Sequence, residues 1–158
     1  AANGAPEAAA GAQRFVFDEF FLGTVSGRDL VQDRRGRVRQ SFVVDMRGHW
    51  RGADFVLDEF FRMSDGTTQR RTWIVTRSEA GRYWAAGDDL VGFAEGESEP
   101  GSVRWRYRLV VPAGGRHIAL SFDDRMVLMG DGTVLDVSDM RKFGIRGGRV
   151  VLALARRL

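Results

Sequence analysis

The chain has 158 residues, 44% of them hydrophobic, and its 24 basic and 21 acidic residues leave a net charge of +3. This length suits one domain with a substantial core, and no stretch approaches the roughly 20 apolar residues that a membrane helix requires. The absence of cysteine excludes disulfides, thiolate metal sites and cysteine catalysis. Lys142 is the only lysine, so arginine supplies nearly all the positive charge. These arginines suit either an anionic partner or solvated strand faces interleaved with Asp and Glu.

The first 13 residues are mostly small and include no large apolar side chain. This composition predicts a flexible N-terminal tail over residues 1–13. The chain starts without methionine, so we expect either that a targeting segment has been removed or that the sequence starts at a chosen boundary. Residues 14–158 are expected to form a single domain.

Apolar and polar residues alternate along most of the chain from residue 38 onward. Trp105 and Tyr107, for example, alternate with Arg104, Arg106 and Arg108. A period of two is typical of half-buried antiparallel strands, because successive side chains point to opposite faces. The pattern predicts a helical turn at residues 17–21, followed by strands near residues 23–32, 37–50, 53–63, 67–77, 82–88, 90–97, 102–111, 116–123, 133–139 and 148–154.

Short turns connect these segments. Asp-Gly and Gly-Gly pairs, such as Asp65-Gly66 and Gly114-Gly115, supply the positive backbone angles that tight hairpins need. Short links favour pairing between neighbouring strands, and closure into a barrel removes exposed sheet edges. We therefore predict an all-β fold, a single antiparallel up-and-down barrel of about 8–10 strands with a short N-terminal helical turn.

The predicted interior is rich in aromatic residues. A barrel of this size is either filled by its side chains or holds one small ligand. Arg70 lies on the face opposite Trp73 and could meet a carboxylate head group, although alternation alone does not show which face is inside. The candidate ligand-binding residues are Phe42, Trp50, Trp73, Trp105, Tyr107, Phe122 and Arg70.

Motifs for catalysis and for metal binding are not recognisable. Asp88, Asp123 and Asp124 are candidates for acid or base chemistry, but such acids also cap turns and pair with arginines. The only histidines, His49 and His117, lack metal-ligand spacing, so we expect no metal and no cofactor. Alternation puts the arginines of residues 104–108 opposite their aromatic neighbours, which argues against a nucleic-acid platform.

An ordered series of short motifs resembles a bacterial family called Domain of Unknown Function 3833. The resemblance covers roughly residues 17–152, and its one departure is Arg125, where a tryptophan is expected. The motifs are residues 31–34 with Gly36, residues 42–46 with Gly48 and Trp50, and residues 57–59, 65–66, 71–73, 87–88, 105–107, 122–126 and 142–144.

The resemblance implies a lipocalin-like β domain that is commonly exported and often lipid-anchored, in the periplasm or at the outer membrane. Association of the family with genes for modified fatty acids implies an acyl ligand. The leading hypothesis is therefore a cell-envelope barrel that binds an apolar molecule of the fatty-acyl or lipid class. The alternatives are an enzyme acting on modified fatty acids through carboxylates at the barrel mouth, and a filled barrel that interacts through its arginine-rich outer surface.

Overall fold

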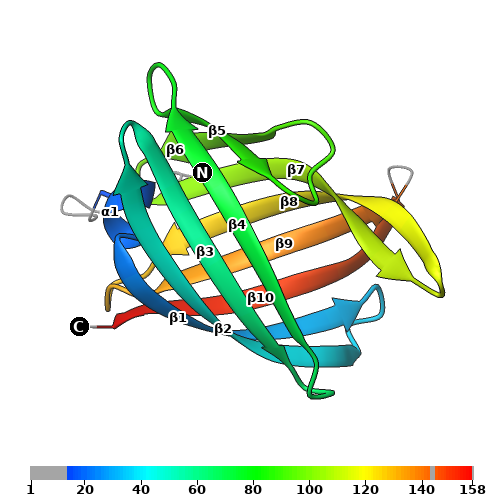
Figure 1. Cartoon of the computed structure of the whole chain (residues 1–158). Helices are drawn as coiled ribbons and strands as arrows, with labels where there is room; N and C mark the ends of the chain where they lie inside the picture. The colour runs from blue at the N-terminus through cyan, green and yellow to red at the C-terminus, as the bar shows by residue number, and fades with distance from the viewer. Residues whose placement is uncertain (1–13, 143–144, 158) are drawn as a thin grey trace, which may run out of the picture.

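The computed structural model describes residues 14–142 and 145–157, which form a closed antiparallel barrel (Figure 1). Every strand pairs with its sequence neighbours, and β1 closes the barrel against β10. The elements are α1 (Phe17–Phe20), β1 (Gly23–Asp33), β2 (Val38–Arg51), β3 (Asp54–Met63), β4 (Thr68–Arg77), β5 (Arg82–Gly87), β6 (Ala94–Glu99), β7 (Ser102–Ala113), β8 (Arg116–Leu128), β9 (Val134–Lys142) and β10 (Ile145–Arg157).

The predicted fold class is confirmed, with ten strands and up-and-down topology. The predicted N-terminal tail, residues 1–13, lies outside the described residues. The largest differences in strand bounds are at β8, which ends at Leu128 instead of residue 123, and at β6, which starts at Ala94 instead of residue 90. Leu90 makes only an isolated bridge to Leu109, and residues 88–93 form a loop. No helix in the described part of the chain has the length and apolar character needed to cross a bilayer.

Helix α1 closes one end of the barrel. Figure 1 shows it beside the start of β1, at the opposite end from the β1–β2, β3–β4 and β7–β8 hairpins. Phe15, Phe17, Phe20 and Phe21 are all buried there. The Phe17 ring lies 5.3 Å from the Trp105 ring, so the helical turn is packed directly onto the inner wall. Burial of four aromatic rings explains why so short a helix is held in place.

An ion pair ties this helix to the wall. Arg77, on β4, donates hydrogen bonds through Nη2 to both carboxylate oxygens of Asp18, at 2.7 and 2.9 Å. Asp18 is buried, whereas the Arg77 side chain is half exposed. We expect Asp18→Asn to lower the free energy of unfolding by about 1–2 kcal/mol, because the charge-assisted bonds are weakened. Urea denaturation measures this, and an unchanged midpoint would contradict the role given to the pair.

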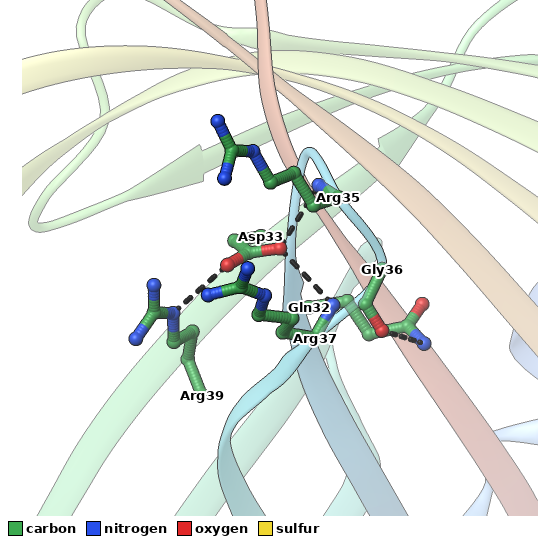
Figure 2. A network of polar contacts seen from close by, with 6 residues as sticks. All are labelled: Gln32, Asp33, Arg35, Gly36, Arg37 and Arg39. Atoms are coloured by element: carbon green, nitrogen blue, oxygen red, sulfur yellow. Dashed lines mark hydrogen bonds and ion pairs between the residues drawn. The ribbon is translucent and has the colours of Figure 1, made fainter.

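Aspartates also fix the hairpins at the far end, and the β1–β2 turn is drawn in Figure 2. Asp33 Oδ1 accepts hydrogen bonds from the backbone N–H groups of Arg35 and Arg37, at 2.9 and 3.0 Å. Its Oδ2 accepts one from Arg39 Nε, at 3.0 Å. Gly36 in this turn has φ +79°, a conformation that favours glycine. Asp33 and Gly36, three residues apart, therefore fix this turn together.

Candidate functional site: a cavity inside the barrel

The barrel is hollow, with a cavity of about 230 Å³. Phe17 and Phe21 of the helical end line its floor, and Gln69 lines it near the opposite hairpins. Because Gln69 is exposed to solvent, the cavity reaches the surface at that end. A site closed by α1 at one end and open at the other suits a small molecule that enters along the barrel axis.

Aromatic side chains form much of the cavity wall. The rings of Tyr107 and Phe122 stack with centroids 5.1 Å apart and planes 6° apart. Trp73 meets Tyr107 edge-on at 5.3 Å, and Phe42 meets Phe61 in the same way, also at 5.3 Å. Two groups of neighbouring strands supply these rings, β2 to β4 and β7 with β8. Contacts between them fix the ring orientations before any ligand arrives.

A chain of polar groups crosses this apolar interior. Tyr107 donates a hydrogen bond through its hydroxyl to Asp124 Oδ2 at 2.9 Å, and the Ser138 hydroxyl donates to Asp124 Oδ1. Asp136, on β9, shares a further hydrogen bond with Asp124. Across the lumen, the indole N–H of Trp73 donates to Glu59. Carboxyl groups thus face the cavity from several strands.

Burial changes the acidity of these carboxyls. Loss of solvent raises the pKa of Asp29 to about 8, and the charge of Asp124 adds to the effect. Burial also raises the pKa of Glu59 to about 7 and that of Asp124 to about 6, the latter against the hydrogen bonds from Ser138 and Tyr107. The pKa of Asp136 is raised well above its usual value by burial and by the neighbouring Asp124. Several of these groups therefore carry protons near neutral pH.

The one guanidinium among the described cavity-lining residues belongs to Arg71. It pairs in register with Glu59 across β3 and β4. Its guanidinium lies 5.6 Å from the centre of the Phe61 ring and 5.9 Å from that of Trp73. Arg71 Nε lies 3.9 Å from Asp89 Oδ2, in the loop at the open end. Neighbouring acids and ring faces therefore surround this guanidinium, although its Nε atom is buried without a hydrogen-bond partner.

The raised pKa values predict that the barrel loses stability as the pH rises. The folded state keeps a proton on Asp29 up to about pH 8, whereas the unfolded chain releases it near pH 4, so folding takes up protons over this range. We expect the free energy of unfolding to fall from pH 5 to pH 8. Asp29→Asn removes the effect of Asp29 and should stabilise the protein at pH 8 by at least about 1 kcal/mol relative to wild type.

Thermal denaturation at several pH values tests this expectation. Some carboxyls have a lowered pKa in the folded state, such as Asp33, Asp65 and Asp123. They lose their stabilising effect only as the pH falls through that lowered pKa, which lies below the range from pH 5 to pH 8. Asp88→Asn, at an exposed turn, is the matched control and should behave like wild type at both pH values. A melting temperature that rises from pH 5 to pH 8 would contradict the account.

The cavity brings together most of the aromatic residues named from the sequence. Its lining includes Phe42, Trp73, Trp105, Tyr107 and Phe122. Two further candidates are placed elsewhere. Trp50 is 45% exposed at the helical end of β2 and packs edge-on against Phe55. Arg70 is exposed on the outer face, with its guanidinium over the Phe60 ring at 5.1 Å.

The structure places the three acidic candidates in different environments. Asp124 faces the cavity, whereas Asp123, its neighbour on β8, points outward and binds Arg104 at 2.6 and 2.9 Å. Asp88 lies exposed in the turn after β5. Of these three, only Asp124 can therefore act on a molecule in the lumen. Arg125, at the departure from the family pattern, is exposed on the outer face and does not alter the cavity.

Sequence reasoning did not single out Asp29, Asp136 or Ser138 as site residues, although all three line the cavity and are buried. On β9 the usual polarity is inverted, because Asp136 and Ser138 face inward while Leu135 is 36% exposed. The sequence feature that could have placed Asp136 and Ser138 inside is Val134, an apolar residue on the same strand face, which is fully buried in the structure. Among the described residues, no cluster of three or more His, Asp or Glu side chains could hold a metal ion.

A protein family matches almost the whole chain. The family described as "Protein of unknown function (DUF3833)" matches residues 2–156. The chain belongs to this family. The resemblance found in the sequence motifs is therefore confirmed, and family membership now extends over the barrel and its helical plug. No curated protein matches the sequence.

Solved structures share the fold of this DUF3833 member. One is Rv2717c from M. tuberculosis, with a TM-score of 0.60 and 15% identity, covering 88% of this chain and 94% of that one. Another is the S-type phycobiliprotein lyase CPES from Guillardia theta, with a TM-score of 0.62 and 7% identity, covering 87% of this chain and 88% of that one. At these identities the similarity establishes a common lipocalin-like barrel fold.

Proposed function

We propose that this protein binds a small, largely apolar molecule of the fatty-acyl or lipid class inside the barrel. The observation that carries the proposal is the cavity of about 230 Å³, lined by aromatic and aliphatic side chains with a few polar groups. Small-molecule sites in proteins have this composition, because apolar walls supply affinity and a few polar groups fix orientation. The alternative of a filled barrel loses its basis, since it requires a lumen packed solid with side chains.

The cell envelope is the proposed location, as a periplasmic or outer-membrane-associated protein. This part of the proposal rests on the export expected from the family resemblance. Fractionation of cells that carry the natural gene, followed by immunoblotting, tests it. Recovery in the periplasmic or membrane fraction is the expected result, and recovery with cytoplasmic markers alone would overturn it.

Uptake of a fluorescent acyl probe tests the binding function. Fluorescence titration should show saturable binding at one site per chain, and unlabelled alkyl amphiphiles should displace the probe. A cavity of limited volume predicts an optimum chain length, with weaker competition on either side of it. Linear, non-saturating fluorescence that no amphiphile displaces would overturn the proposal.

An enzyme acting on modified fatty acids is the second candidate. Glu59 and Asp124 favour it, because they share one cavity and have pKa values of about 7 and 6, the range in which a carboxyl serves as acid or base. Incubation with hydroxylated, unsaturated or cyclic fatty acids, followed by mass spectrometry, tests it. Turnover that Asp124→Asn abolishes would support it, and recovery of every substrate unchanged would remove it.

A further inference from the structure

The polar side of the cavity has more acids than its bases can match. Four carboxyl groups line it, from Asp29, Glu59, Asp124 and Asp136, against the single guanidinium of Arg71 among the described residues. Arg71 is engaged by Glu59 and by aromatic faces. The other three carboxyls lie on the wall formed by β1, β10, β9 and β8, and none of the described cavity-lining residues on these strands is basic.

Two of these carboxyls lie on either side of one residue. Leu152, on β10, pairs in register with Asp29 on β1 and with Asp136 on β9. Asp29 is 5% exposed and Asp136 is 6% exposed. The Oδ1 atoms of both residues are buried without a hydrogen-bond partner in the described structure. A buried carboxyl oxygen without a partner is costly, so each of these two atoms is suited to a ligand group that donates a hydrogen bond.

We infer that Asp29, Asp136 and Asp124 form a subsite for the protonated amine of an amphiphile whose alkyl chain lies against the aromatic wall. An ammonium group offers three donors and one compact charge, which matches two unpartnered carboxyl oxygens beside a third carboxylate. Tyr107, Trp73 and Phe122 lie next to Asp124 or to one another and provide the apolar surface for the chain. This inference rests on the proposed function and names the head group that the site selects.

Charge distinguishes an amine from the other head groups. A free carboxylate at this subsite would be placed beside three carboxyls, so repulsion and desolvation both oppose it. An alcohol can donate only one hydrogen bond and brings no charge. A metal ion is not the occupant that the geometry suits, because the described residues form no metal-binding cluster.

Binding of an amine should also change the protonation of the subsite. The ionisable groups that face the subsite are Glu59 on β3, Arg71 on β4, Tyr107 on β7 and Asp124 on β8. Burial keeps protons on Asp29 and Asp136, and a bound ammonium ion favours their ionised forms. Binding of the amine should therefore release protons, and its affinity should rise from pH 6 to pH 8, as long as the amine stays protonated.

A matched series of ten-carbon amphiphiles tests the inference. Decylamine, decanol and decanoate are titrated against a bound fluorescent probe at pH 7.5, and we expect decylamine to bind at least about tenfold more tightly than decanol, with decanoate weakest. Asp29→Asn and Asp136→Asn should each reduce this preference severalfold, measured as the ratio of the decylamine affinity to the decanol affinity of the same variant. Asp123→Asn, on the outer face of β8, should leave all three affinities unchanged.

Calorimetry of wild-type protein gives a readout that needs no variant. Decylamine titrated in two buffers of different ionisation enthalpy should show proton release, and decanol should show none. Decanoate binding more tightly than decylamine, or amine binding without proton release, would overturn the subsite and leave the acyl-binding function in place. Failure of all three compounds to displace the probe would count against the binding function itself.

Discussion

Replacing Gly48 by alanine should lower the free energy of unfolding by about 3 kcal/mol or more, because an added methyl group has no room there. Gly48 lies on β2 where the chain after α1 crosses the end of the barrel. A Cβ at this position would lie 1.9 Å from the carbonyl oxygen of Phe21 and 2.6 Å from the Phe55 ring. The oxygen belongs to the backbone, so the clash can be relieved only by moving the helical plug or the strand.

Urea denaturation of Gly48→Ala and Gly130→Ala measures this effect against a matched control. A Cβ at Gly130 would meet no atom within 4 Å, and the backbone there is not left-handed. The control should therefore unfold within about 0.5 kcal/mol of wild type. Equal denaturation midpoints for the two variants would show that the plug is not packed as described.

Replacing Leu109 by tryptophan should abolish ligand uptake while the barrel still folds. Leu109, on β7, is 3% exposed and lines the cavity. An indole at this position would fill part of the cavity, whose volume of about 230 Å³ is the space available to a ligand. We expect affinity for the acyl probe to fall at least about tenfold, and overpacking to cost about 1–3 kcal/mol of stability.

Leu135→Trp provides the control, since it makes the same change on the outer face of β9, where Leu135 is 36% exposed. It should bind the acyl probe like wild type. Circular dichroism and thermal melting establish that both variants are folded at the temperature of the binding assay. A folded Leu109→Trp variant with wild-type affinity would mean that the ligand binds elsewhere.

The strands and their topology were predictable because the physics behind them is local. Alternation identifies a strand, and Asp-Gly or Gly-Gly pairs identify the hairpins between strands. Trp105 and Tyr107 lie on one face of β7 and the neighbouring arginines lie on the other, as the period of two requires. The bounds of β3 and β4 were accordingly predicted to within one residue at each end.

Other features depend on information that a single strand does not contain. Trp50 shares the inward side of β2 with Gly48, but alternation does not report height along the barrel axis, and Trp50 lies at the rim. On β4 the alternation did not reveal the inner face, and it is Arg71 with Trp73 that faces the lumen. The placement of Asp29 and Asp136 on either side of Leu152 depends on the register of β1 and β9 against β10.

Native mass spectrometry of gently purified protein shows whether the lumen holds an apolar ligand. We expect a population heavier than the chain by the mass of one amphiphile, at close to one molecule per barrel. Solvent extraction should then release a molecule with an alkyl or acyl chain. A protein mass without adduct, together with no uptake of added alkyl amines or acyl chains, would contradict the account.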